Sequence, residues 1–225
     1  MVNGHEMVRP TGLSRTYPNL IGSESARGTE YQAFGGNKPH HVTILPFTRL
    51  NGGPMDFTPG IFVQDISAVT DGRNTSWVNA TIANQLALYV TMSSPLQMAA
   101  DLPEHYEQFM DAFQFIKDVD IDWIQSQYLL AEPGDYLVVA RQGKKNGQWF
   151  CGGVTDDQRR TLDVPMSFLD PGKTYVATIY ADAPDADYKK NPQAYTITTR
   201  DVTSSDVIPI TMAPGGGFAI SFVEK

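Results

Sequence analysis

The spacing of apolar and polar residues changes near residue 120, and the two parts predict different structures. Upstream, apolar residues between 78 and 90 recur at helical spacing, and Thr75 or Ser76 can cap that helix. A short buried strand is expected over Leu96–Ala100. A second helix should start at Asp101, because Asp101 and Glu104 have the spacing of a capping box. Its expected apolar face is Tyr106, Phe109, Met110, Phe113 and Ile116.

From Gln125 onward, short apolar runs bounded by turn residues replace the helical pattern. A hairpin turn is expected at Lys144–Gly147, and Tyr175, Ala177 and Ile179 alternate with their neighbours as in a strand that packs on one face. The runs predict strands at 126–131, 135–142, 148–155, 159–165, 174–182, 194–200, 207–212 and 217–224. Eight such strands predict an antiparallel β-sandwich.

The order of elements upstream of residue 120 is loop, helix, strand, loop and helix. This order is typical of the closing part of an α/β barrel. We therefore predict an α/β plus all-β chain, with the C-terminal portion of a (β/α)8 barrel at 1–120 and an antiparallel β-sandwich at 121–225. Phe109, Phe113 and Trp123 are expected near an apolar junction between the two parts.

Composition excludes several classes of protein. The chain has 225 residues of which 41% are hydrophobic, which is enough for real cores. A net charge of −8 makes nucleic acid an unsuitable partner, and no apolar run approaches the roughly 20 residues of a membrane span. The single cysteine, Cys151, excludes an internal disulfide and is interpreted as a small core residue. The chain opens without a secretory leader, and we favour a downstream part of a longer precursor.

The chemistry-bearing residues gather in the first thirty-one positions, where Pro and Gly interrupt regular structure. Glu6, Glu24 and Glu30 stand there together with His5. Paired carboxylates serve as general acid and base, and carboxylate oxygens also bind calcium. Three converging glutamates would repel one another, so they predict a bound metal or raised pKa values; isolated surface charges are the alternative.

Other charged residues have simpler interpretations. His40 and His41 are expected to form an exposed loop pair rather than a metal site. The arginines at positions 9, 15 and 27 are expected to tether loops to carboxylates or carbonyls, with binding of a charged substrate as the alternative.

The same stretch resembles the active-site region of glycoside hydrolase family 97, in particular its inverting α-glucosidases of the starch-utilisation type. The resemblance is carried by His5-Glu6, Arg9–Gly12, Arg15–Asn19, Glu24, Arg27-Gly28, Glu30-Tyr31, Leu45–Arg49, Gly52–Asp56, Ser94–Leu96, Pro133–Tyr136 and Gly172–Tyr175. That family has an N-terminal β-sandwich, a (β/α)8 barrel and a C-terminal β-sandwich. The resemblance implies that this chain holds the last barrel strands and the C-terminal sandwich.

The resemblance also implies roles for individual residues. Glu30 matches the general acid, and Glu6 matches one of two carboxylates that activate the attacking water. Glu6, Glu24 and Glu30 match calcium ligands, and His5 matches a histidine that contacts the sugar. The second water-activating glutamate and one further ligand have no counterpart in this sequence. A periplasmic or secreted location of the full-length protein is implied as well.

Three functions remain open. The first is calcium-dependent hydrolysis of α-linked gluco-oligosaccharides with inversion, by an enzyme of which this chain alone is an inactive part. The second is a retaining α-galactosidase of the same family; Glu6 directly after His5 favours inversion, because retaining members need no base there. The third is a non-catalytic carbohydrate-binding module, which would show a row of exposed aromatics such as Tyr188 and Tyr195.

Overall fold

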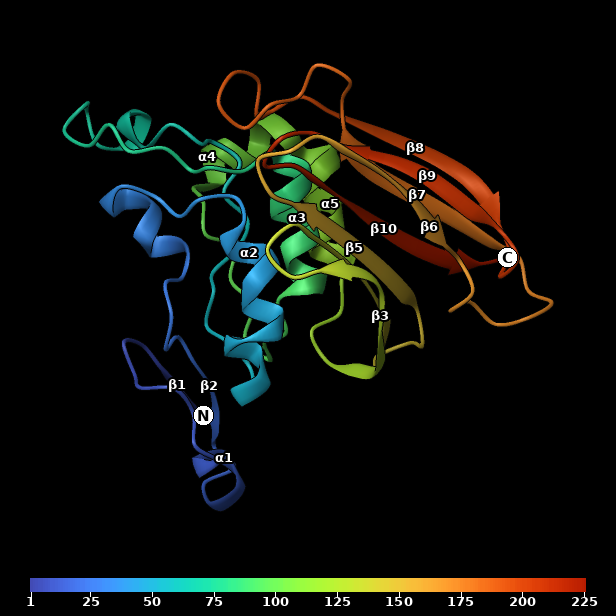
Figure 1. Cartoon of the computed structure of the whole chain (residues 1–225), viewed down its shortest axis with the longest axis horizontal. Coiled ribbons are helices and arrows are strands. Elements are labelled where there is room, and N and C mark those ends of the chain that lie inside the picture. Colours follow the sequence, from blue (N-terminus) through green and yellow to red (C-terminus); the bar gives the residue numbers. More distant parts are fainter.

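The computed structural model describes residues 1–225, and its largest element is an antiparallel sheet in the C-terminal half (Figure 1). The strand order is β3-β4-β5-β10-β7-β8. Its strands are β3 (Trp123–Glu132), β4 (Tyr136–Gly143), β5 (Trp149–Thr155), β7 (Tyr175–Asp182), β8 (Tyr195–Val202) and β10 (Gly217–Glu224). A separate pair joins β6 (Arg160–Pro165) and β9 (Val207–Met212). These are the eight predicted strands, and their ends differ from the prediction by three residues or fewer.

The small β6–β9 pair covers one face of the large sheet, so the two sheets form a sandwich of unequal halves. Every second residue of β10, namely Phe218, Ile220 and Phe222, points into the core between them. Cys151 of β5 lies in the same core and is fully buried, which confirms its interpretation as a packing residue. The Lys144–Gly147 turn connects β4 to β5 as expected, with Gly147 at a φ of 74°.

Helices cover the opposite face of the large sheet (Figure 1). All ten residues of α3 (Ile82–Thr91) are buried, and Thr81 caps the helix by accepting a hydrogen bond from the Asn84 amide. The expected cap at Thr75 or Ser76 is therefore wrong by five or six residues. Gly152 of β5 permits the contact, because a Cβ there would lie 2.8 Å from the Ala87 carbonyl oxygen. The central strands are thus buried on both faces.

The second predicted helix is broken into α4 (Pro103–Tyr106) and α5 (Met110–Asp118), with the 3-10 turn η5 (Glu107–Phe109) between them. Phe109, Phe113 and Trp123 all pack against the core between α3, α5 and the sheet, as predicted. Met110 does not belong to the apolar face, because 48% of it is exposed.

The segment before α4 differs from the prediction. Leu96–Ala100 forms no strand, and its apolar side chains are exposed. Asp101 does not cap α4, which begins after Leu102. Its carboxylate instead accepts hydrogen bonds from the backbone amides of Phe62 and Val63, far away in sequence. A long-range backbone contact has therefore displaced the local capping box.

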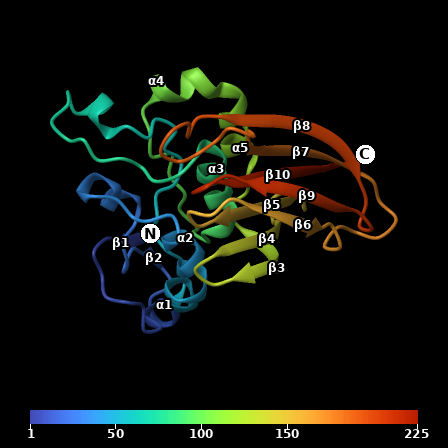
Figure 2. The same cartoon turned by 45° about the horizontal axis from the view of Figure 1, so that its top comes forward.

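The N-terminal part contains one parallel pair, β1 (Val2–Gly4) and β2 (Leu20–Ser23), and a parallel bridge from Ser23 to Met55. No barrel closes within this chain. Most of its strands belong to antiparallel sheets. Its remaining elements are short helical turns: α1 (Leu13–Thr16), η1 (Thr29–Phe34), α2 (His41–Ile44), η2 (Leu45–Phe47), η3 (Arg49–Gly52) and η4 (Ile66–Val69). In both views this part lies on the far side of α3 from β6 and β9 (Figure 2). None of the helices has the length and apolar character needed to cross a membrane.

A buried carboxylate connects the sandwich to the turn before β10. Asp182 Oδ2 accepts hydrogen bonds from the amides of Ala213 and Gly217, both at 2.8 Å. Burial raises the pKa of this carboxyl from 3.8 to about 6. The folded state therefore holds the proton more tightly than the unfolded state, and its stability falls as pH rises from about 4 to about 6.

Replacing Asp182 with Asn removes this titration while keeping an oxygen acceptor. Between pH 4 and pH 7 the free energy of unfolding of Asp182→Asn should rise relative to wild type by up to about 3 kcal/mol, since one pKa unit is about 1.4 kcal/mol. Denaturant unfolding at several pH values measures the difference. Asp163→Asn, at an exposed position of β6, is the matched control and should show little dependence on pH. A flat difference for Asp182→Asn would contradict the prediction.

Candidate active site

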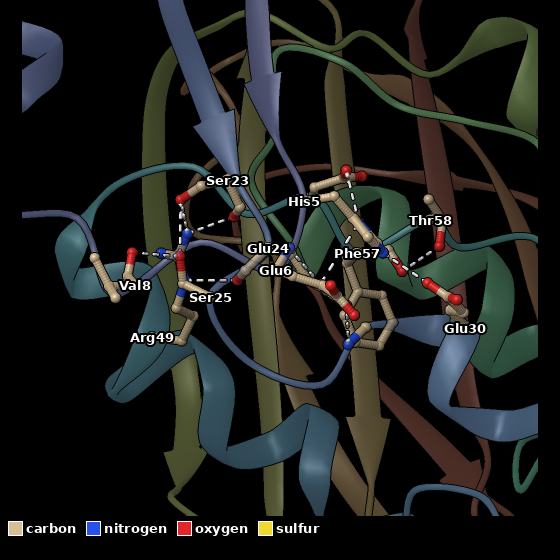
Figure 3. A network of polar contacts seen from close by, with 12 residues as sticks. His5, Glu6, Val8, Ser23, Glu24, Ser25, Glu30, Arg49, Phe57 and Thr58 are labelled. Carbon is tan, nitrogen blue, oxygen red and sulfur yellow. Dashed lines mark hydrogen bonds and ion pairs between the residues drawn. The ribbon is translucent and has the colours of Figure 1, made fainter. Parts of the chain in front are cut away.

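His5, Glu24 and Glu30 meet at one place although they come from three separate segments (Figure 3). His5 Nε2 lies 2.6 Å from Glu30 Oε2, and His5 Nδ1 lies 3.5 Å from Glu24 Oε2. One ligand atom of each residue lies within 4.8 Å of the others. The sequence predicted that Glu6, Glu24 and Glu30 converge; the structure brings Glu24 and Glu30 together with His5.

Backbone amides position Glu24. Its Oε1 accepts a hydrogen bond from the Gly28 amide, and its Oε2 accepts one from the Glu6 amide. Glu24 follows directly on β2, so the end of a strand aims it at His5. The carboxylate of Glu6 is not part of the cluster, and Glu6 contributes its backbone N–H there.

Arg49 ties the loops below the site together. Its guanidinium donates hydrogen bonds to the carbonyl oxygens of Ser23, Glu24, Gly53 and Pro54, and to the Ser23 hydroxyl (Figure 3). No carboxylate pairs with it, and burial lowers the pKa of the guanidinium. The fork of planar N–H groups thus satisfies backbone carbonyls that would otherwise be buried without partners.

The arginines expected to tether loops do not do so. The side chains of Arg9, Arg15 and Arg27 form no ion pair and donate no hydrogen bond, and Arg49, which was not predicted, fills that role. His41 Nε2 contacts the Arg27 carbonyl oxygen at 2.8 Å, and neither His40 nor His41 belongs to a cluster suited to a metal.

Sequence reasoning did not assign Asp56 to the site. Asp56 is buried, and its Oδ2 lies 3.7 Å from His5 Nδ1. Its Oδ1 has no hydrogen-bond partner. In the sequence, only the position of Asp56 at the end of the Gly52–Asp56 motif pointed to the site. The bridge that places Met55 beside β2 cannot be read from the sequence.

The backbone is strained around this cluster. Four residues other than glycine have a positive φ, and three of them, Glu6, Ser25 and Thr58, lie next to the site. Such conformations cost about 1–3 kcal/mol each and persist where surrounding contacts hold them. Ser25, for example, donates a hydrogen bond to the Val8 carbonyl oxygen.

Electrostatics favour a positive charge at the centre of the cluster. The hydrogen bond to Glu30 raises the pKa of His5, and the negative charges of Glu24, Glu30 and Asp56 add to that effect. A cavity of about 340 Å³ opens over the cluster, lined by ten residues that include His5, Glu24 and Glu30. The cavity is large enough for a sugar ring and offers both proton-transferring and cation-binding groups.

The aromatic residues considered for a carbohydrate-binding module do not form an exposed row. Tyr188 is only 9% exposed, and its carbonyl oxygen accepts a hydrogen bond from the Trp77 indole. Tyr195 packs against Phe109 and donates a hydrogen bond to Asp111. Both rings are explained by packing within the chain.

Known proteins resemble this chain in sequence and in fold. The family model described as "Glycosyl-hydrolase 97 C-terminal, oligomerisation" matches residues 122–223. Solved structures of a glycoside hydrolase family 97 enzyme from Pseudoalteromonas sp., in complex with panose and with acarbose, superpose with a TM-score of 0.93. They are 47% and 48% identical in sequence and cover 99% of this chain, which covers 34% of theirs.

Two curated relatives extend the comparison. A retaining alpha-galactosidase of Bacteroides thetaiotaomicron is 32% identical over 96% of this chain, and a probable retaining alpha-galactosidase of Streptomyces bingchenggensis is 32% identical over 97%. The chain spans about a third of the length of each, 32% and 31%. By their names, these relatives and solved structures are glycosidases. The chain belongs to glycoside hydrolase family 97 and corresponds to its C-terminal part.

Arg49 provides a test of how the site is built. In Arg49→Lys, an ammonium group cannot reach four carbonyl oxygens at once, so several buried acceptors lose their donor. We expect a loss of about 2–4 kcal/mol in the free energy of unfolding. Thermal or denaturant unfolding measures it. Arg73→Lys, at a side chain that is 81% exposed, is the control and should behave like wild type. Equal behaviour of the two variants would show that Arg49 does not hold the loops.

Proposed function

We propose that the protein containing this chain is a calcium-dependent glycoside hydrolase that cleaves α-glucosidic bonds of starch-type oligosaccharides with inversion. The observation that supports the proposal most is the meeting of Glu30, Glu24 and His5 in one cavity. A carboxyl group, a histidine and a set of fixed acceptors at one point suit proton transfer to a glycosidic oxygen.

In the proposed mechanism Glu30 is the general acid. It is the more exposed of the two carboxylates, with 59% of its side chain accessible, so a glycosidic oxygen can approach it. Glu6 is one of two carboxylates that activate the attacking water, with the second outside this chain. His5, held between Glu30, Glu24 and Asp56, contacts the sugar. Inversion requires the acid and the base on opposite faces of the sugar, with a water between base and sugar.

The residues present fit a calcium ion. Glu24 and Glu30 offer carboxylate oxygens, the ligands that calcium prefers, and the buried Asp56 Oδ1 lacks any partner. Glu24, already oriented by two backbone amides, and Glu30 would hold the ion. Glu6, which lines the same cavity, would join them by turning its carboxylate toward the ion. Bound calcium would neutralise the carboxylates and orient the sugar.

The choice of sugar and stereochemistry rests on the relatives. The enzymes crystallised with panose and acarbose are 47% and 48% identical to this chain, and the retaining alpha-galactosidases are 32% identical. Higher identity to the first group supports an α-gluco-oligosaccharide as substrate. A retaining α-galactosidase is the second candidate, because both curated relatives carry that name.

The proposal includes the organisation of the full-length protein. Residues 1–120 would complete a (β/α)8 barrel with strands that lie outside this chain, and residues 121–225 would form the C-terminal sandwich. The parallel β1–β2 pair and the Ser23–Met55 bridge support the barrel, because parallel pairing of short strands is typical of it. A periplasmic or secreted location belongs to the same proposal.

Glu30→Gln in the full-length protein tests the general acid. Hydrolysis of maltose-like substrates should slow by about 100-fold or more, because the departing sugar needs a proton. Aryl glucosides with acidic phenols should change much less, and Glu6→Gln should slow both classes. Initial rates on the two substrate classes give the comparison. Equal losses on both for Glu30→Gln would remove Glu30 from the acid role.

The anomer of the first product decides between the two candidate reactions. An inverting α-glucosidase releases a β-sugar from an α-glucoside, which NMR detects at early times before mutarotation. Release of an α-sugar, or activity on α-galactosides alone, would favour the retaining α-galactosidase.

Calcium dependence is tested through Glu24. Chelation should abolish activity and lower the melting temperature of the full-length protein, and added calcium should restore both. Glu24→Gln removes one charge from the cation site, so about tenfold more calcium or higher should be needed for half-maximal effect. Thermal shift against calcium concentration gives a readout that does not depend on turnover. Glu104→Gln, at an exposed position of α4, is the control. A wild-type protein indifferent to chelator would refute the metal site.

A further inference from the structure

The short turn that carries Glu30 is weak by itself. η1 (Thr29–Phe34) is only six residues long, and 3-10 hydrogen bonds have poorer geometry than those of an α-helix. Gly28, at its N-cap position, has no side chain that could cap it. The carboxylate of Glu30 contacts His5, but the backbone of η1 sets where the side chain starts. The position of Glu30 therefore depends on what fixes this turn.

Asn37 fixes η1 on both sides of Glu30. Its side-chain Nδ2 donates a hydrogen bond to the Gly28 carbonyl oxygen, and its backbone amide donates one to Gln32 Oε1, both at 3.0 Å. Gly28 and Gln32 are the second residues before and after Glu30. Asn37 and Gln32 are both buried within this chain. One buried residue thus clamps the turn at two points.

A tight return of the chain makes this clamp possible. Gly35 and Gly36 follow η1 with φ values of 102° and 81°, which favour glycine. A Cβ at position 36 would lie 2.7 Å from Asn79 Nδ2 and 3.0 Å from Gln32 Oε1. The space beside Gly36 is therefore occupied by the carboxamide groups that form the clamp.

Asn79 anchors the clamp to α3. Its Nδ2 donates a hydrogen bond to the Asn37 carbonyl oxygen at 2.9 Å. Asn79 lies two residues before Thr81, the N-cap of the buried helix α3. Asn74, from the same segment, donates a hydrogen bond to the Ala33 carbonyl oxygen in η1 at 2.7 Å. Hydrogen bonds thus connect the segment that leads into α3 directly with the turn that carries Glu30.

These contacts bear on the proposed proton transfer. The acid has to lie within hydrogen-bond reach of the departing oxygen, and a misplacement of about 1 Å can cost about 100-fold in rate. We propose that Asn37, anchored by Asn79, is the positioning residue for the general acid Glu30, an inference that rests on the proposed function. Neither asparagine lines the cavity of the site, so both act on the reaction through η1.

The dependence on the leaving group separates positioning of the acid from general damage. Maltose needs a proton on its departing sugar, whereas α-glucosyl fluoride releases a stable anion and depends little on an acid. In the full-length protein, Asn37→Ala should lower kcat for maltose by about tenfold or more and leave KM within about twofold of wild type. The rate on α-glucosyl fluoride should stay within about twofold.

Two further variants complete the comparison. Asn79→Ala should act in the same direction with a smaller loss, because the contacts of Asn37 with η1 remain. Asn146→Ala is the control and should change neither substrate. Asn146 lies at the exposed hairpin turn of the sandwich, and its side chain also makes hydrogen bonds there.

A measurement without turnover tests the clamp itself. Hydrogen exchange of the backbone amides of residues 28–37, followed by mass spectrometry, should be faster in Asn37→Ala and Asn79→Ala than in wild type. It should be unchanged in Asn146→Ala. If Asn37→Ala does not fold, Asn79→Ala carries both measurements with the same criteria.

The outcomes distinguish this inference from the proposed function. Equal losses on maltose and α-glucosyl fluoride, or unchanged exchange in residues 28–37, overturn the positioning role. A wild-type protein that hydrolyses neither glucosyl substrate shows that the proposed function is wrong, and the matching pair of galactosyl substrates then tests the positioning role by the same contrast. Inactivity on both pairs overturns both proposals.

Discussion

The fold depends on the burial of α3 between two unlike parts of the chain. One side of the helix packs on the large sheet, where Gly152 lets the helix backbone approach β5. Arg141 of β4 donates a hydrogen bond to the Val90 carbonyl oxygen near the end of the helix, and so satisfies an acceptor that the helix itself leaves free. Because the helix is buried all round, its polar groups must find partners in neighbouring segments.

Those partners connect the sandwich to the candidate active site. Gln85 of α3 accepts hydrogen bonds from the amides of Gly60 and Ile61, and the Tyr89 hydroxyl donates to the carbonyl oxygens of Pro59 and Met98. The segment held in this way begins just after Asp56 and Thr58, which border the cluster around His5. The C-terminal sandwich is thus a mechanical support for the site, although it contributes no residue to it.

Two kinds of contact hold the site together: hydrogen bonds to the backbone below the cluster and contacts between charged side chains within it. Below the cluster, Arg49 holds backbone carbonyl oxygens by hydrogen bonds, without a carboxylate as ion-pair partner. Above it, the carboxylates of Glu24 and Glu30 both lie close to His5. Two negative charges at this separation repel each other, and a positively charged histidine or a bound cation offsets that repulsion. The scaffold below the cluster thus rests on hydrogen bonds to the backbone, and the groups that can exchange protons lie above it.

The amino-acid pattern alone was sufficient for the eight strands of the sandwich, the Lys144–Gly147 turn and the buried role of Cys151. These features depend on local alternation and on turn residues, which are visible over a few positions. The motif in the first thirty-one residues selected His5, Glu6, Glu24 and Glu30 as candidates, and the structure brings three of them, His5, Glu24 and Glu30, together.

Tertiary structure decided what depends on distant partners. Leu96–Ala100 is not a strand, and Asp101 is not the N-cap of α4: one of its carboxylate oxygens accepts from the amides of Phe62 and Val63, and the other contacts His105. Arg49, rather than the arginines of the first loop, holds the site, because only the fold brings four carbonyl oxygens around its guanidinium. Asp56 joins the cluster for the same reason: its place follows from a bridge between Ser23 and Met55, thirty-two positions apart, which no local pattern encodes.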